Sequence, residues 1–439
     1  MSEKQNNTNT NNSWADILKV SKKGLRGTIQ NRLTAVAGRI PSALSTGSIF
    51  LDYVFNGGFI PGQCNHFFGP TASGKSTMCY RIISANQKVA VDLVDQGMGS
   101  LPNYLPNYKG KVKTRPVIIC DAEGGLNEQF LAGCGVDFND ENFSVFYPEN
   151  GEDWFTFYKR AMMAYQKAHL IEEGKDKEPR LPNNYYGPIS VIDSLAAFVP
   201  KSMLDDDQEQ MAFLARLLSN YLPLNCAVNS MAKATSFWVN QVRTNPMQMY
   251  GSPETTKGGQ APYFYASSNL RVSRTGQDEN VFEDDLYGGE KEVKGYTLKI
   301  TPKKCRWAAV TGNSYEILTI MGHGFSRISD LWNYAQITGQ LKQNGAWYTL
   351  DVIGRSDLNI TKNVRAQDIK NHFRENNLYE IFVMQLFSGA CYGTTLTDAQ
   401  LEILGAIETK GVPDIVTPEE EAALAKMTEE IKKTQKDEE

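Results

Sequence analysis

A glycine-rich run, FFGPTASGKST (residues 67–77), has the residue types and spacing of a phosphate-binding loop. It follows an apolar β-type run and opens a helix-like segment, which is the context that a G-x-x-x-x-G-K-[ST] motif requires. Glycines let backbone N–H groups point at phosphate oxygens, while Lys75 would neutralise the β- and γ-phosphates and Ser76 would ligate Mg²⁺. We therefore predict a nucleotide and Mg²⁺ site rather than an ordinary strand–turn–helix, with a loop formed by Gly69, Pro70, Thr71, Ala72, Ser73, Gly74, Lys75, Ser76 and Thr77.

Acidic residues at the ends of two other apolar runs could complete this site. ISVIDS delivers Asp193 to the carboxyl end of an expected strand, where open α/β sheets bind ligands, so we assign Asp193 to Mg²⁺ together with Ser76. VIICDAEGG carries Asp121 and Glu123, which alternation along an extended strand places on the same side. A carboxylate near the γ-phosphate can activate water. A turn or helix cap at Asp193 and a surface ion pair at Glu123 are the plainer alternatives.

Apolar β-type runs alternate with helix-like segments from Leu44 onward, and this alternation predicts an α/β fold. Its sheet should be mostly parallel and twisted, with helices on both faces. The expected strands are residues 64–69, 117–123, 143–147, 189–194 and 236–241, with an antiparallel-looking continuation at 296–304 and 313–320. The expected order of parts is a disordered start (1–13), a helix and linker (14–43), the core (44–330), a small α+β module (331–411) and an acidic tail (412–439).

The composition of the chain favours a soluble, intracellular protein with no membrane contact. Hydrophobic residues make up 41% of the 439 residues, yet no apolar run is long enough to cross a bilayer. Seven cysteines lie scattered without a C-x-x-C pair, so we expect buried, reduced thiols rather than disulfides or a zinc site. The net charge of −5 equals that of residues 414–439, which carry nine acids and four lysines. That tail either screens a basic surface elsewhere or is a solvated, partly helical segment.

The span from Asn240 to Val272 is too long, and too rich in glycine, proline and polar residues, for an ordinary strand connection. Such a loop is usually functional or disordered. Its glycines would let the backbone approach a ligand closely, because no side chain stands in the way.

Together these motifs make the chain resemble the bacterial RecA recombinases. STGSIFLDYVFNGG, GPTASGKST, DAEGGLNEQF, VIDSLAAFVPK, the 240–272 span and NGAWY occur in the order and spacing of that family. Many ATPases share the phosphate loop, whereas YGSPETTKGG and GAWY are specific. The resemblance covers most of residues 44–350 and implies a RecA-like ATPase core. Three polar insertions, at residues 95–114, 172–187 and 274–295, fit a divergent or phage-encoded member.

The resemblance also implies roles for residues around the nucleotide. Glu123 matches the water-activating glutamate of the family, and Gln241 matches the glutamine that senses the γ-phosphate. Phe130 falls where the family stacks an aromatic ring on adenine, and Asn127 falls where it places an adenine-contacting acid, a departure that leaves base selectivity open. Lysines of the family reach the nucleotide of a neighbouring subunit. The candidates for that role are Lys303 and Lys304, which could equally form a surface basic pair.

In the RecA family the 240–272 span corresponds to the second DNA-binding loop. Basic side chains there would release counterions from phosphates, and a methionine or aromatic ring would wedge between bases. A shorter first loop follows Asp193, although its acidic stretch at 205–209 makes its share of DNA affinity doubtful. The candidate DNA-binding residues of the two loops are Met211, Arg216, Arg243, Met249, Tyr250, Gly251, Lys257, Gly258 and Gly259.

The function implied by the resemblance is ATP-dependent homologous recombination and DNA repair in the cytoplasm of a bacterium or a phage-infected cell. ATP and Mg²⁺ would bind between protomers and promote a helical filament on single-stranded DNA, which would then pair with a homologous duplex. The N-terminal helix would dock on the neighbouring protomer. The alternatives are a hexameric, ring-forming motor ATPase, a scaffold that binds ATP and DNA without turnover, and a small-molecule kinase, which the missing arginine-rich lid disfavours.

Overall fold

The computed structural model describes residues 43–96, 98–105, 108–171, 179–182, 185–203, 210–244, 254–282 and 292–388. The expected disordered start, all but the last residue of the 14–43 segment, and the acidic tail lie outside these residues. The same holds for Met249, Tyr250 and Gly251, and for the side chain of Met211, whose backbone lies in the first turn of a helix.

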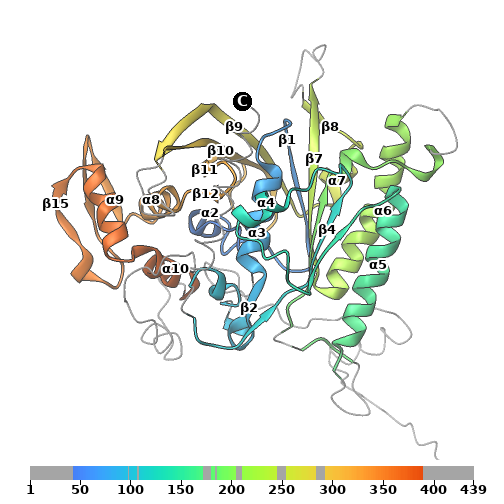
Figure 1. Ribbon diagram of the computed structural model, residues 1–439, viewed down its shortest axis with the longest axis horizontal. Helices are drawn as coiled ribbons and strands as arrows, with labels where there is room; N and C mark the ends of the chain where they lie inside the picture. The colour runs from blue at the N-terminus through green and yellow to red at the C-terminus, as the bar shows by residue number, and fades with distance from the viewer. Residues whose placement is uncertain are drawn as a thin grey trace, which may run out of the picture. The chain divides into compact units, whose positions relative to one another are not determined.

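One large sheet organises the described residues (Figure 1). Its strands are β1 (Cys64–Gly69), β4 (Val117–Asp121), β5 (Phe143–Phe146), β6 (Ile189–Asp193), β7 (Thr235–Thr244), β8 (Glu254–Thr256), β9 (Ser268–Phe282), β10 (Glu292–Cys305), β11 (Tyr315–Ile320) and β12 (Gly324–Phe325). Their order is β12-β11-β10-β9-β1-β7-β6-β4-β5, with β8 paired to β7. Neighbours from β9 to β5 run parallel, and β10 to β12 continue antiparallel. The predicted α/β class with a mostly parallel core is confirmed.

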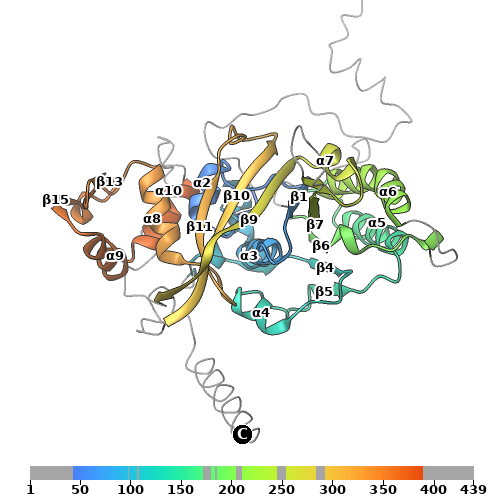
Figure 2. The ribbon, with the colours of Figure 1, turned by 90° about the horizontal axis from the view of Figure 1, so that it is seen from above.

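Helices cover both faces of this sheet because successive strand residues point to opposite sides. The helices around it are α3 (Lys75–Asn86), α4 (Glu128–Gly133), α5 (Gly151–Ala168), α6 (Gln210–Ala232) and α7 (Ala261–Tyr265). On β7, Phe237 packs in the core that contains α3, whereas the next residue, Trp238, packs in the core beneath α5 and α6. Figure 2 shows α5 and α6 side by side at one end of the sheet. None of the described helices is long and apolar enough to span a bilayer.

Short elements fill the stretch between α3 and β4. A two-stranded sheet joins β2 (Lys88–Ala90) to β3 (Val112–Thr114). The 3₁₀-helices of the described chain are Val91–Gln96, Leu101–Asn103, Leu195–Ala197, Lys201–Met203 and Ser356–Leu358. The second of these lies within the polar insertion at residues 95–114, and the first overlaps its start, so this insertion carries local structure of its own.

The C-terminal part packs on the first described helix, α2 (Ile49–Val54). It consists of α8 (Arg327–Ile337), β13 (Leu341–Asn344), β14 (Trp347–Leu350), β15 (Ile360–Val364), α9 (Ala366–Glu375) and α10 (Leu378–Ser388), with the three strands forming a separate sheet. The expected boundary between 330 and 331 falls inside α8. Buried side chains of this part belong to the same hydrophobic cluster as α3 and β1, so no gap in the core separates them.

Two buried carboxyl groups hold α2 in place. Asp330, on α8, accepts hydrogen bonds from the backbone N–H groups of Ile49 (2.9 Å) and Phe50 (3.0 Å). Asp52 accepts from Thr46 N–H at 2.6 Å, from Tyr104 Oη at 3.2 Å and from Ser45 Oγ. Burial raises the pKa of Asp52 to about 7 and that of Asp330 to about 6, because the charged form loses its hydration. Folding therefore favours the protonated form of both groups.

We expect Asp52→Asn to flatten the pH dependence of stability. The Asp52 pKa is 3.8 without the fold and about 7 within it, so its contribution is complete below about pH 4 and is lost as the pH rises towards 7. The free energy of unfolding, measured by urea denaturation between pH 4.5 and 7.5, should therefore fall less in the variant than in the wild type. The difference should be on the order of a few kcal/mol at the upper end of this range. Asp92→Asn, at an exposed position, is the matched control. Parallel profiles for Asp52→Asn and wild type would contradict this origin of the pH dependence.

Candidate nucleotide and DNA site

The phosphate loop lies at the carboxyl end of β1, where Gly69 ends the strand and Lys75 begins α3. A Cβ on Gly69 would lie 1.9 Å from the carbonyl oxygen of Val272, so only glycine fits there. Gly74 has a φ of 88°, which is also a glycine conformation. The loop is thus shaped by backbone requirements that the motif reports directly.

The Lys75 ammonium is folded back onto its own loop. Its Nζ donates to the carbonyl oxygens of Pro70 (2.5 Å) and Gly69 (3.2 Å) and to Ser73 Oγ (3.3 Å). Burial lowers the Lys75 pKa, and the nearby carboxylates of Asp193 and Glu123 act in the opposite direction. All three hydrogen-bond acceptors of Lys75 Nζ are neutral oxygens. A phosphate group, which is negatively charged, would be a stronger acceptor for this ammonium group.

Ser76 and Asp193 meet as the sequence predicts. Ser76 Oγ donates to Asp193 Oδ2 at 2.6 Å, although 117 residues separate them in the chain. Burial raises the Asp193 pKa to about 6, the hydrogen bond from Ser76 opposes this, and the negative charges of Glu123 and Asp121 add to the rise. A hydroxyl and a carboxylate beside crowded negative charge form an oxygen donor set of the kind that Mg²⁺ uses.

Glu123 lies just beyond β4 and is oriented from two sides. Its Oε1 accepts hydrogen bonds from Gln241 Nε2 at 3.1 Å and from Ser194 Oγ. Sequence analysis predicted Glu123 and Gln241 at this site but did not single out Ser194. Ser194 directly follows Asp193, and that adjacency was the available signal for it.

Asp121 has a structural task beside this site. Its carboxylate accepts three backbone N–H groups, from Gly124 (2.8 Å), Gly125 (3.2 Å) and Leu126 (3.0 Å). Asp121 therefore holds the turn that follows β4 and carries Glu123. Of the two acids expected on one side of the strand, Asp121 binds backbone N–H groups and Glu123 contacts the side chains of Gln241 and Ser194.

Gln241 links the phosphate loop to the span that leads into the expected DNA-binding loop. On the sheet it lies opposite Gly69 in the pairing of β7 with β1. Its carbonyl oxygen accepts the N–H of Lys257 at 3.2 Å, and Asn240 Nδ2 donates to the Lys257 carbonyl at 3.0 Å. The chain before residue 245 and the chain after residue 253 are therefore joined at Gln241, the residue whose side chain contacts Glu123.

The described residues of the two DNA-loop candidates lie on α6, on β7 and just after β8. Arg216 is exposed on α6. The residue before it, Ala215, lies close to Gly259, because a Cβ added to Gly259 would come 3.3 Å from the Cβ of Ala215. Arg243 is exposed on β7, opposite Thr255 of β8. Packing also explains why residue 258 is glycine, because a Cβ there would lie 2.3 Å from Leu218 Cδ1.

The adenine candidates lie on α4. Asn127 is the N-cap of this helix, since its Oδ1 accepts the N–H of Phe130 at 2.9 Å. The Phe130 ring meets Tyr80 edge-on, with centroids 5.5 Å apart and planes at 73°. Asn127, where the family has an acid, therefore caps α4 with its amide oxygen, and its amide nitrogen takes no part in the cap.

The two candidate lysines lie at the other edge of the sheet. Lys304 pairs with Asn269 near the amino end of β9, whereas the phosphate loop follows the carboxyl end of β1, which runs parallel to β9. Lys304 Nζ donates to the carbonyl oxygens of Phe264 (2.9 Å) and Tyr263 (3.1 Å), and Lys303 is exposed. Desolvation, followed by the charge of Arg306, lowers the Lys304 pKa. Neither lysine is therefore placed to serve the phosphate loop of its own chain.

The sequence is similar to that of RecA proteins. Residues 187–310 match the family model described as the RecA N-terminal domain. The RecA protein of Chloroherpeton thalassium is 29% identical over 311 residues, covering 70% of this chain and 71% of that protein. The RecA protein of Arthrospira platensis is 29% identical over 357 residues, covering 80% of this chain and 81% of that protein. Among solved structures, the RadB recombinase aligns with a TM-score of 0.39 and 16% identity, over 64% of this chain and 98% of its own.

Proposed function

This chain is a divergent member of the RecA family, and on that premise we propose that it is a DNA-dependent ATPase that forms helical filaments on single-stranded DNA and exchanges strands with a homologous duplex. ATP is the substrate of the proposed hydrolysis, and Mg²⁺ is its cofactor. Single- and double-stranded DNA and further copies of the chain are the proposed partners.

One observation carries this proposal: a hydrogen-bonded path joins the phosphate loop to the span that leads into the DNA-binding loop. Gln241 lies opposite Gly69 on β1, its side chain contacts Glu123, and its carbonyl holds Lys257. If the Gln241 side chain turns towards a γ-phosphate, the backbone at Gln241 and Lys257 moves with it. Nucleotide state would then control the grip on DNA, which is what an ATP-dependent filament requires.

In the proposed hydrolysis, Glu123 accepts a proton from the attacking water. Hydrogen bonds from Ser194 and Gln241 orient its carboxylate, and Asp121 holds the turn beneath it. Lys75 leaves the carbonyls of Gly69 and Pro70 for the terminal phosphate oxygens, where its charge stabilises the charge that develops during phosphoryl transfer.

Ser76 and Asp193 are the residues that would hold Mg²⁺. When bound, the ion offsets charge on the β- and γ-phosphates. Among the described residues, no group of three or more His, Cys, Asp and Glu side chains comes together to bind a metal. Two protein oxygens suit Mg²⁺, which keeps waters and substrate phosphates as its other ligands.

Two unlike surfaces at opposite edges of the sheet support head-to-tail assembly. The nucleotide residues follow the carboxyl ends of β1, β4 and β6. At the amino ends, α7 exposes the rings of Tyr263, Phe264 and Tyr265, with Phe264 64% exposed, next to Lys303 and Lys304. Exposed apolar patches of this kind are typical of protein interfaces. A contact between unlike surfaces propagates into a ring or a helix, and we propose that Lys303 approaches the nucleotide of the neighbouring protomer.

The test of this function is a D-loop assay with homologous and heterologous duplexes, run beside electron microscopy with single-stranded DNA and a non-hydrolysable ATP analogue. We expect helical filaments and joint molecules only with the homologous duplex. Closed rings alone would favour the hexameric motor. Filaments without DNA-stimulated phosphate release would favour the scaffold.

We expect the double substitution Arg243→Ala and Lys257→Ala to weaken the salt dependence of DNA binding. Each phosphate contact contributes about 0.7 to the slope of log affinity against log salt for single strands, so the slope should fall by about one to two. Fluorescence anisotropy of a labelled oligonucleotide between 50 and 300 mM salt (roughly the range over which phosphate contacts are lost) gives the slope. Lys111→Ala with Lys113→Ala, two exposed lysines beside and on β3, is the matched control. An unchanged slope in the Arg243 and Lys257 variant would mean that these residues do not contact phosphates.

A further inference from the structure

Two cysteines meet where β1, α6 and the end of α7 come together. Cys64 begins β1 and is buried, whereas Cys226, on α6, is only partly buried. Their Sγ atoms are 3.3 Å apart although 162 residues separate them in the chain. We propose that Cys64 and Cys226 form a reversible oxidation site, at which a small peroxide converts the two thiols into a disulfide.

The neighbours of the pair assign a different role to each sulfur. The hydrogen-bonding contact with Cys64 lowers the pKa of Cys226, and the positive charges of Arg306 and Lys304 lower it further, against the effect of burial. Burial raises the pKa of Cys64 well above its usual range. Cys226 is therefore the thiolate that attacks, and Cys64 is the thiol that resolves.

Hydrogen bonds hold Cys64 in position for this reaction. Asn229 Nδ2 donates a hydrogen bond to Cys64 Sγ at 3.2 Å, and Cys64 Sγ donates in turn to Asn225 Oδ1 at 3.5 Å. Disulfide sulfurs lie about 2.0 Å apart, so the two sulfurs must approach by little more than about 1 Å. A small side-chain rotation supplies such a movement without displacing α6 from β1.

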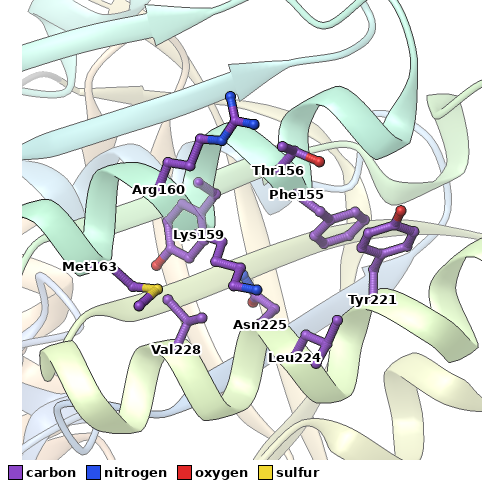
Figure 3. A pocket seen from close by; sticks show the side chains of 10 residues that line it. Phe155, Thr156, Lys159, Arg160, Met163, Tyr221, Leu224, Asn225 and Val228 are labelled. Atoms are coloured by element: carbon purple, nitrogen blue, oxygen red, sulfur yellow. The ribbon is translucent and has the colours of Figure 1, made fainter.

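Asn225 separates the pair from a neighbouring cavity that neither cysteine lines. This cavity has a volume of about 300 Å³ and lies between α5 and α6, where Figure 3 shows Asn225 among the lining side chains. Asn225 is 3% exposed, and its Nδ2 has no hydrogen-bond partner among the described residues. Access for an oxidant is therefore at Cys226, the partly buried member of the pair, while Asn225 holds Cys64 through its Oδ1.

The proposed reaction balances with hydrogen peroxide as the oxidant. The Cys226 thiolate attacks one peroxide oxygen, the O–O bond breaks, and the leaving hydroxide takes a proton to form water. The sulfenic acid on Cys226 is then attacked by the Cys64 sulfur. The S–S bond forms, the S–O bond breaks, and a second water leaves with the Cys64 proton.

The experiment uses the full chain, reduced and then treated with hydrogen peroxide, with free thiols alkylated before non-reducing peptide mapping. We expect a peptide linked between Cys64 and Cys226, formed at a rate independent of protein concentration and removed by dithiothreitol. Links to other cysteines, links between chains only, or over-oxidised Cys226 beside an unmodified Cys64 would overturn the proposal.

Two single variants test the order of attack and serve as a safeguard against a folding defect. In Cys64→Ser, a sulfenic-acid probe such as dimedone should label Cys226, because the resolving thiol is gone. In Cys226→Ser, Cys64 should stay unlabelled, and no link should form. Cys305→Ser, at another partly buried cysteine, is the matched control and should keep the link. Labelling of Cys64 in a folded Cys226→Ser protein would reverse the assignment and refute it.

Discussion

Glu123→Gln should lower DNA-stimulated ATP hydrolysis by about 100-fold or more while ATP-dependent binding to single-stranded DNA is retained. General base catalysis contributes on the order of 10²–10⁴ in rate, and glutamine cannot accept the proton of the attacking water. Glutamine can still meet Gln241 and Ser194 through its amide oxygen, so the orientation of the loop should persist. Phosphate release and filament electron microscopy, measured on the same preparation, separate the two effects.

The control for this variant is Glu128→Gln. Glu128 is an exposed acid in the first turn of α4, five residues further along the same chain segment, and it has no place in the proposed reaction. Its hydrolysis rate should match the wild type. If Glu123→Gln kept most of its activity, another group would have to be the base. Loss of DNA binding along with hydrolysis would show that Glu123 acts through the position of Gln241.

The strands and the phosphate loop could be predicted because their signals are local. An apolar run between polar segments indicates a buried strand. The glycine at 74 has a backbone conformation that few other residues adopt, and the glycine at 69 allows the close approach of the Val272 carbonyl. Asp193 and Ser76 could be paired without the structure, since carboxyl ends of parallel strands share one edge of the sheet.

Contacts between distant segments could not be predicted in the same way. Ser194 meets Glu123 across two strands, and Lys304 caps the carbonyls of α7 from 40 residues away. Nothing in the local pattern of either residue reports its partner. Asn127 is a different case, because an Asn directly before a helix is an ordinary N-cap signal, and the resemblance drew attention to its place at the nucleotide instead.

Lys75→Ala should abolish ATP-dependent assembly on single-stranded DNA, because the variant loses the cation that binds the β- and γ-phosphates. A hydrogen bond to a charged group contributes about 1.5–3 kcal/mol, so nucleotide affinity should fall by roughly 10- to 150-fold. The folded state should not suffer, since burial lowers the Lys75 pKa and the ammonium has only neutral oxygens of its own loop as hydrogen-bond partners. Thermal melting without nucleotide should therefore match the wild type, while the rise in melting temperature on adding an ATP analogue should be lost.

The comparison with Glu123→Gln makes this prediction discriminating. Glu123→Gln should bind nucleotide and assemble without turnover, whereas Lys75→Ala should already fail to bind nucleotide. Lys113→Ala, at an exposed lysine on β3, should bind, assemble and hydrolyse like the wild type. If Lys75→Ala still assembled on DNA at nucleotide concentrations that saturate the wild type, DNA binding would be independent of the phosphate loop. The path through Gln241 and Lys257 would then be a structural link without a regulatory role, and a scaffold would describe the protein better than a recombinase.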